Sequence, residues 1–129
     1  IEKRIKNSNL HVKIENDTSF YGRKNALQRC FSNVINNSLM YGEKINVTVQ
    51  RSSNRAVILF DDDGPGIPPE HYRNVFKPFF RLDKSRSLNK SGVGLGLAIV
   101  EDIVHSHGGN IHLSKSDMGG LQVKISLPF

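Results

Sequence analysis

The feature that most constrains the fold is a continuous apolar run, Ala56–Phe60, that ends in the acidic and glycine-rich segment Asp61–Gly66. A short apolar run of this kind is typical of a strand that is covered on both faces. Acidic residues, glycine and proline then interrupt the strand pattern abruptly. We therefore predict a central strand whose end carries carboxylates beside a loop of irregular backbone.

Alternation of apolar and polar residues predicts the other strands, and apolar residues at helical spacing predict the helices. The predicted strands span residues 10–14, 45–49, 56–60, 111–113 and 121–127. The predicted helices span residues 24–41, 68–76 and 94–107. We predict an α/β (α+β) two-layer sandwich, in which a mixed, mostly antiparallel sheet of about five strands carries three helices on one face. The other face of the sheet is expected to be comparatively polar.

The chain of 129 residues is long enough for one domain with a hydrophobic core and too short for two. Its net charge of +6 comes from scattered basic residues without zinc-finger spacing or RNA-binding aromatic motifs, so we expect no nucleic-acid partner. The single cysteine, Cys30, lies on an apolar helical pattern, which predicts a buried thiol in a reducing compartment. Because the chain begins with Ile1 rather than a methionine, we expect a segment of a longer protein.

Two asparagines, Asn33 and Asn37, are four residues apart in the predicted helix 24–41, so their side chains leave the same side of the helix. An amide oxygen is a neutral, hard ligand that suits Mg²⁺, an ion that usually keeps several waters and adds substrate phosphates. Asparagine is also a mediocre helix former, so two of them inside a helix call for a reason. The alternative is that Asn33 and Asn37 are merely polar residues on the protein surface. We interpret Asn36, which faces another direction, in that way.

The segment after the central strand places Asp62 beside Gly64, Gly66 and Ile67. A carboxylate at a strand end can accept a hydrogen bond from an exocyclic amine such as that of adenine, and glycines let the backbone approach a flat ring closely. The alternative is a simple acidic turn. A calcium-binding loop is excluded, because Leu59 would then occupy the first ligand position.

A glycine-rich segment, Gly92–Leu97, opens the predicted helix 94–107. Helix N-termini bind anions through their free N–H groups, and glycines let a phosphate come close. The spacing does not fit the dinucleotide fingerprint, and no Gly-Lys-Ser/Thr follows as a P-loop requires. The preceding segment, Arg81–Ser91, is basic and serine-rich, and we predict a mobile loop whose arginines suit phosphate.

The order of these clusters along the chain resembles the ATP-binding catalytic domain of bacterial sensor histidine kinases, in the GHKL or Bergerat superfamily. Asn33–Tyr41 resembles the N box, Asp62–Ile67 the first G box, Phe76–Phe80 the F box, and Gly92–Leu97 the second G box. Gly119-Gly120 is similar to the terminal glycine motif. The likeness covers about residues 21–128 and is greatest to the osmosensor type of these kinases.

The resemblance implies a Bergerat ATP-binding fold, ATP and Mg²⁺ as cofactors, and roles for individual residues. It implies that Asn37 binds Mg²⁺, that Asp62 reads the adenine amine, and that Asn37 and Arg81 are catalytic. The nucleotide-binding residues that it implies are Asn33, Asn37, Tyr41, Asp62, Gly64, Gly66, Ile67, Phe79, Arg81, Arg86, Gly92, Val93, Gly94, Leu95, Gly96 and Leu97.

The resemblance also implies a reaction and partners. The γ-phosphoryl group of ATP passes to a histidine on a separate dimerisation domain, and then to a response regulator. We expect residues 1–129 to form this single catalytic domain, with an N-terminal strand region at 1–20, an ATP lid at 81–91, and no phosphoacceptor or sensor domain. We expect a monomeric fragment of a homodimeric parent, and a cytoplasmic domain of an inner-membrane protein.

The chain departs from the family pattern at Met40, where the family often has lysine or arginine, at Arg23-Lys24, where it often has aspartate-proline, and at Leu121, where threonine is common. Met40 bears on function, because it removes an expected phosphate contact. This leaves open a nucleotide-sensing module that favours the phosphatase state, and a GHKL-type ATPase with its own hydrolysis remains a further alternative. The histidines of the chain have no phosphoacceptor context, and we interpret them as structural or surface residues. They are His11, His71, His105, His107 and His112.

Overall fold

The computed structural model describes residues 10–14, 24–77 and 96–128, excluding the side chains of residues 10–14, 24, 40 and 41. The predicted loop at 81–91 and most of the predicted N-terminal region lie outside these ranges. The strands are β1 (Leu10–Ile14), β2 (Ile45–Ser52), β3 (Arg55–Asp62), β4 (Asn110–Lys115) and β5 (Leu121–Pro128). The helices are α1 (Lys24–Tyr41), the 3-10 turns η1 (Pro69–His71) and η2 (Asn74–Phe76), and α2 (Gly96–Ser106).

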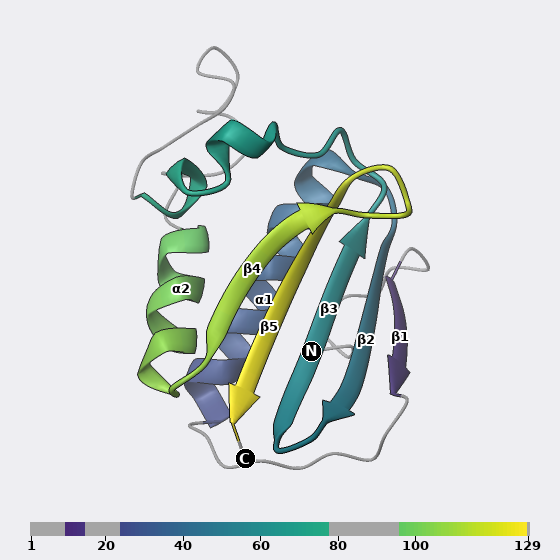
Figure 1. Ribbon diagram of the computed structural model, residues 1–129. Coiled ribbons are helices and arrows are strands. Elements are labelled where there is room, and N and C mark those ends of the chain that lie inside the picture. The colour runs from purple at the N-terminus through teal and green to yellow at the C-terminus, as the bar shows by residue number, and fades with distance from the viewer. Residues whose placement is uncertain (1–9, 15–23, 78–95, 129) are drawn as a thin grey trace.

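The strands form a five-stranded sheet in the order β1-β2-β3-β5-β4 (Figure 1). β1 pairs with β2 in parallel, and the other three pairs are antiparallel. The parallel edge pair follows from the connection, since α1 separates β1 from β2 and returns the chain to the end where it began. The predicted mixed, mostly antiparallel sheet with helices on one face is therefore confirmed.

The predicted short helix at 68–76 consists of two 3-10 turns. His71 N–H donates to the Pro68 carbonyl at 2.8 Å, and Lys77 N–H donates to the Asn74 carbonyl at 3.0 Å. Pro68 caps η1 and Pro69 is its first residue, positions where a proline costs no helical hydrogen bond, so the prolines do not explain the shortened helix. No helix in the described part of the chain is long and apolar enough to cross a membrane.

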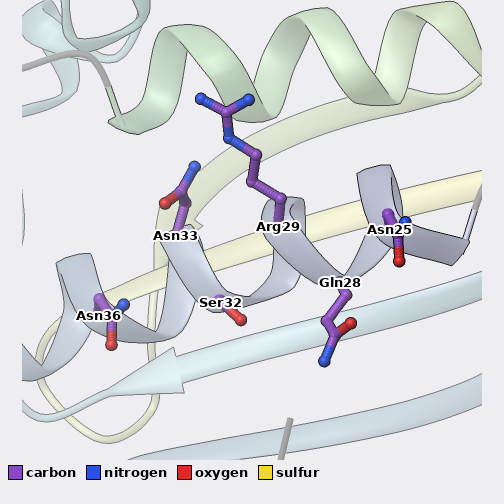
Figure 2. A pocket seen from close by; sticks show the side chains of 6 residues that line it. All are labelled: Asn25, Gln28, Arg29, Ser32, Asn33 and Asn36. Atoms are coloured by element: carbon purple, nitrogen blue, oxygen red, sulfur yellow. The ribbon is translucent and has the colours of Figure 1, made fainter.

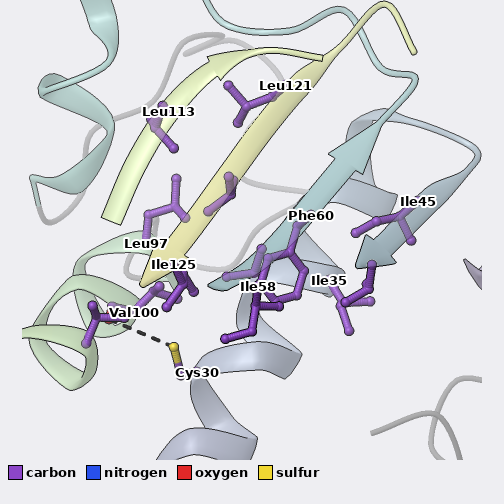
Figure 3. Packing of buried hydrophobic residues seen from close by; sticks show 14 of the residues in the cluster. Cys30, Ile35, Ile45, Ile58, Phe60, Leu97, Val100, Leu113, Leu121 and Ile125 are labelled. Carbon is purple, nitrogen blue, oxygen red and sulfur yellow. Dashed lines mark hydrogen bonds between the residues drawn. The ribbon is translucent and has the colours of Figure 1, made fainter. Parts of the chain in front are cut away.

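The hydrophobic core fills the space between one sheet face and the two α-helices (Figure 3). Alternate residues of the central strands point into it, including Phe60 of β3 and Ile125 of β5, which are 1% and 0% exposed. Helical spacing brings Cys30 and Val34 of α1 and Val100 of α2 into the same cluster. Burial of these side chains is the main force that holds the helices on the sheet.

The opposite sheet face is mixed rather than fully covered. Strand alternation turns Val57 and Leu59 of β3 to this face, where Val57 is buried and Leu59 is half-buried. Their neighbours on β5, Lys124 and Ser126, are polar. The prediction that Ala56–Phe60 is covered on both faces therefore holds for Val57 and only in part for Leu59.

The turn between β4 and β5 packs directly against the end of β3. Ser116 N–H donates to the Gly120 carbonyl at 2.8 Å, and Gly120 N–H donates to the Asp62 carbonyl at 3.1 Å. A Cβ added to Gly120 would collide with the Asp62 carboxylate and would lie 2.7 Å from the backbone nitrogen of Gly64. Only glycine fits here, because part of what it touches is backbone that cannot rotate away.

We predict that Gly120→Ala lowers the free energy of unfolding by about 1–3 kcal/mol, the usual cost of forcing an extra carbon into a packed site. Urea denaturation of the two proteins measures this difference. Gly96→Ala is the matched control, since a Cβ there meets nothing within 4 Å among the described residues. Equal stability of Gly120→Ala and the parent chain would contradict this packing.

The thiol of Cys30 is fully buried, and burial raises its pKa from 9.0 to about 12. We predict that iodoacetamide does not alkylate the folded protein at pH 8, because the reactive thiolate is absent and the sulfur is enclosed. Mass spectrometry before and after denaturation in urea checks this. Rapid stoichiometric labelling of the folded chain would contradict the burial.

The unfolded thiol ionises near 9.0, so the stabilising contribution of this group should fall as the pH rises from about 9 to about 12.

Candidate functional site

One end of the sheet collects the polar segments that the sequence singled out (Figure 1). α1 ends at Tyr41 and β3 ends at Asp62, which pairs with Ile45 at the start of β2. The β4–β5 turn and the first residue of α2, Gly96, lie at the same end (Figure 1). Segments far apart in the sequence therefore border one region.

The Asp62 carboxylate is held in a fixed orientation at this end. Its side chain is 6% exposed and shares the inner sheet face with Phe60. Its Oδ1 accepts hydrogen bonds from the backbone N–H groups of Gly64, at 3.0 Å, and Leu121, at 3.1 Å. No described residue donates to Oδ2. The carboxylate thus keeps one oxygen as an acceptor for another molecule.

The neighbouring carboxylate of Asp63 has a structural role instead. Its Oδ1 accepts hydrogen bonds from the backbone N–H groups of Lys44, at 2.9 Å, and Glu43, at 2.8 Å. These two bonds hold the pKa of Asp63 below its usual value. A Cβ added to Gly42 would lie 2.8 Å from this oxygen, so glycine is needed for the close approach. Asp63 therefore joins the end of β3 to the turn between α1 and β2.

Asp61, on the other sheet face, anchors the β4–β5 turn. Its Oδ1 accepts hydrogen bonds from Ser116 Oγ at 2.8 Å and from Gln122 Nε2 at 3.1 Å. Ser116 Oγ in turn accepts the Met118 N–H at 3.1 Å. Sequence reasoning missed the separate functions of Asp61 and Asp63. Strand alternation was the available signal, since it places only Asp62 on the same face as Phe60.

Asn33 and Asn37 are half-buried on one flank of α1, as helical spacing predicts. Figure 2 shows Asn33 extending toward the side where α2 packs. Neither side-chain amide forms a hydrogen bond with a described residue. Ser38, next to Asn37 in the sequence, is 4% exposed and lies in the interior instead. The two amides therefore remain available to a ligand between α1 and α2.

The glycines near Asp62 bring backbone segments into contact. Gly66 has a φ of 74°, a conformation that glycine adopts without strain, and a Cβ there would lie 3.5 Å from the Gly120 backbone. Gly64 is half-exposed beside it and donates to Asp62. Ile67 is half-buried against the core. These residues form one wall of the region above Asp62.

The start of α2 is only partly described. Gly96 is its first residue, and Leu97 is 7% exposed and belongs to the hydrophobic core. Phe76, the first residue of the segment that resembles the F box, packs partly against the same core. The side chain of Tyr41 is not described. The predicted site residues that lie outside the described ranges are Phe79, Arg81, Arg86, Gly92, Val93, Gly94 and Leu95.

The described arrangement offers one oriented carboxylate acceptor and two free amides. No group of three or more histidine, cysteine, aspartate or glutamate residues that could hold a metal ion occurs among the described residues. A divalent ion at Asn37 would therefore depend on oxygens of a ligand and on water, which is the usual manner of Mg²⁺ binding beside phosphates.

Comparison with known proteins gives consistent results. The family model described as "Histidine kinase-, DNA gyrase B-, and HSP90-like ATPase" matches residues 22–129. The sensor histidine kinase CpxA of Escherichia coli is 41% identical over 109 residues, which are 84% of this chain and 24% of that protein. The sensor histidine kinase GtrS of Pseudomonas aeruginosa is 40% identical over 107 residues, which are 83% of this chain and 22% of that protein.

A solved structure supports the same assignment. The histidine kinase domain of the E. coli osmosensor EnvZ is 34% identical, with a TM-score of 0.72, and the match covers 98% of this chain and 79% of that one. This chain spans less than a quarter of the length of the two curated relatives. The chain belongs to the family of histidine kinase-, DNA gyrase B- and HSP90-like ATPases, and within it to the ATP-binding catalytic domains of sensor histidine kinases.

Proposed function

We propose that this domain binds Mg-ATP and donates the γ-phosphoryl group to a histidine on the dimerisation domain of its parent sensor kinase. A response regulator then receives the phosphoryl group. The observation that carries the proposal is the placement of Asp62, which is 6% exposed on the inner sheet face. Its Oδ1 is fixed by two backbone N–H groups, while its Oδ2 accepts nothing from the described residues.

Asp62 Oδ2 accepts a hydrogen bond from the exocyclic amine of adenine. A buried carboxylate with a single open acceptor position selects a donor there, because an oxygen at the same place would repel it. Gly64 and Gly66 allow the ring to approach the backbone, and Ile67 supplies an apolar contact. This gives preference for adenine over bases that carry a carbonyl at that position.

The phosphates extend from the adenine along the flank of α1. Asn37 offers its amide oxygen to Mg²⁺, which when bound neutralises phosphate charge. Asn33, one turn away on the same flank, supports the phosphates, and Tyr41 flanks the nucleotide. The N-terminal end of α2, where Gly96 is the first described residue, directs backbone N–H groups toward the anion in this proposal. Resemblance alone assigns further contacts to Phe79, Arg81, Arg86, Gly92, Val93, Gly94, Leu95 and Leu97.

In the reaction the bond between the γ-phosphorus and its bridging oxygen breaks, ADP leaves, and a bond forms to a histidine nitrogen. The histidine loses its proton to a base on its own domain. The part played by this chain is positioning and charge stabilisation, which supply most of the catalysis of phosphoryl transfer. The dimerisation domain, the regulator, a homodimeric parent and a location on the cytoplasmic side of the inner membrane are parts of the same proposal.

We predict that Asp62→Asn reverses part of the base preference. The amide oxygen can keep the two backbone bonds, which turns an NH₂ donor toward the base. Affinity for ADP should fall about tenfold or more, the effect of losing one buried hydrogen bond. Affinity for IDP, which has a carbonyl at the same position, should fall less or rise. Calorimetric titration with both nucleotides measures the ratio, and equal ADP affinity in mutant and parent would refute the assignment.

We predict that the domain phosphorylates a separately produced dimerisation domain of its parent when supplied with Mg²⁺ and labelled ATP. The product should be acid-labile phosphohistidine. Asn37→Ala should reduce the rate at least about tenfold and abolish the Mg²⁺ dependence of ATP binding. Asn46→Ala is the matched control, because Asn46 is exposed on the outer sheet face.

Two results would contradict phosphoryl transfer. Tight ATP binding without phosphohistidine would favour a nucleotide-sensing module. Steady-state hydrolysis by the domain alone, lost in Asn37→Ala, would favour an ATPase.

A further inference from the structure

A polar hollow of about 410 Å³ lies on α1 next to the proposed phosphate region (Figure 2). The described residues that line it all belong to this helix and are Asn25, Gln28, Arg29, Ser32, Asn33 and Asn36. Asn33 is shared between the hollow and the flank that carries Asn37. The hollow therefore borders the proposed nucleotide site at Asn33.

The hollow is suited to an anion. Among the six described residues that line it, Arg29 is the charged one, and α1 contains no acidic residue. The guanidinium forms no ion pair or hydrogen bond with a described residue. An arginine fork next to neutral amide and hydroxyl donors provides several hydrogen bonds to one phosphate.

The position of Arg29 relates it to the far end of the nucleotide. Arg29, Asn33 and Asn37 follow one another at intervals of four residues, so they lie on one flank about 6 Å apart along the axis. Figure 2 shows Arg29 and Asn33 extending to the same side, toward α2. A ligand that starts at Asp62 and passes Asn37 and Asn33 ends nearest to Arg29.

We propose that this hollow is the subsite for the terminal phosphoryl group and that Arg29 distinguishes ATP from ADP. This inference rests on the proposed function, since it takes the nucleotide to run from Asp62 along α1. A guanidinium at this place stabilises the charge that only the triphosphate carries there. The same cation also fits a carboxylate, so an acidic surface of the dimerisation domain is the competing occupant.

The test compares affinities of the 129-residue chain for a non-hydrolysable ATP analogue and for ADP, both with Mg²⁺. Arg29→Gln should weaken the ATP analogue about tenfold, the effect of one charge-assisted hydrogen-bonding group, and change ADP less than about twofold. Lys124→Gln removes the same charge from an exposed site on the outer sheet face and should change neither affinity. Thermal denaturation checks that both variants fold.

Three outcomes would overturn the proposal. The first is equal weakening of the ATP analogue and ADP. The second is an unchanged affinity for the ATP analogue. In the second case, a slower transfer to the dimerisation domain would identify the hollow as a docking surface for that domain. The third is an effect of Lys124→Gln equal to that of Arg29→Gln, which would indicate general electrostatics.

The Asp62→Asn titration separates this inference from the proposed function. If Asp62→Asn weakens ADP while Arg29→Gln leaves both nucleotides unchanged, the nucleotide site stands and the subsite fails. If Asp62→Asn leaves ADP unchanged, the assignment of the adenine site itself fails, whatever Arg29→Gln does.

Discussion

Two backbone N–H groups, those of Gly64 and Leu121, converge on a single oxygen of Asp62 at the end of β3. This interaction joins three segments: the central strand, the glycine-rich loop that follows it, and the start of the last strand. It also fixes the direction of the second oxygen. The Gly120 backbone packs so closely on Asp62 that no side chain fits between them. The region proposed to bind adenine thus depends on contacts that also stabilise the fold.

The three consecutive aspartates at the end of β3 have different surroundings and therefore different roles. Asp61 and Asp62 point to opposite faces because strand side chains alternate, and Asp63 follows the last residue of β3. Asp61 takes two side-chain donors from the β4–β5 region, and Asp63 takes two backbone donors from the α1–β2 turn. Asp62 alone of the three is buried on the inner sheet face, and its Oδ2 accepts nothing from the described residues. The carboxylates of Asp61 and Asp63 therefore hold the segments around Asp62 in place.

Periodicity predicted most of the fold, because alternation and helical spacing are local properties. It located the five strands, both α-helices and the buried Cys30. It could not predict that β5 lies between β3 and β4, or that Gly120 contacts Asp62, since such pairing depends on packing between distant segments. It also treated residues 68–76 as one helix, whereas the chain forms two separate 3-10 turns. Leu97 belongs to the hydrophobic core, and its contact with the nucleotide stays a prediction.

Helix α1 shows why site residues are harder to predict than core residues. Its apolar stripe is fixed by burial, so Cys30 and Val34 must face the sheet. Its polar residues have no such constraint, and hydropathy treats Asn33, Asn36 and Asn37 alike. The fold distinguishes them by what lies opposite: the flank with Asn33 and Asn37 borders α2, whereas Asn36 is exposed. Arg29 is exposed like Asn36, but its spacing from Asn33 places it next to the flank with the two amides. Arg29 has no partner among the described residues and lies next to two amides that also have none. Composition counts Arg29 as one more basic residue, and only the fold shows that it lies beside the proposed ligand site.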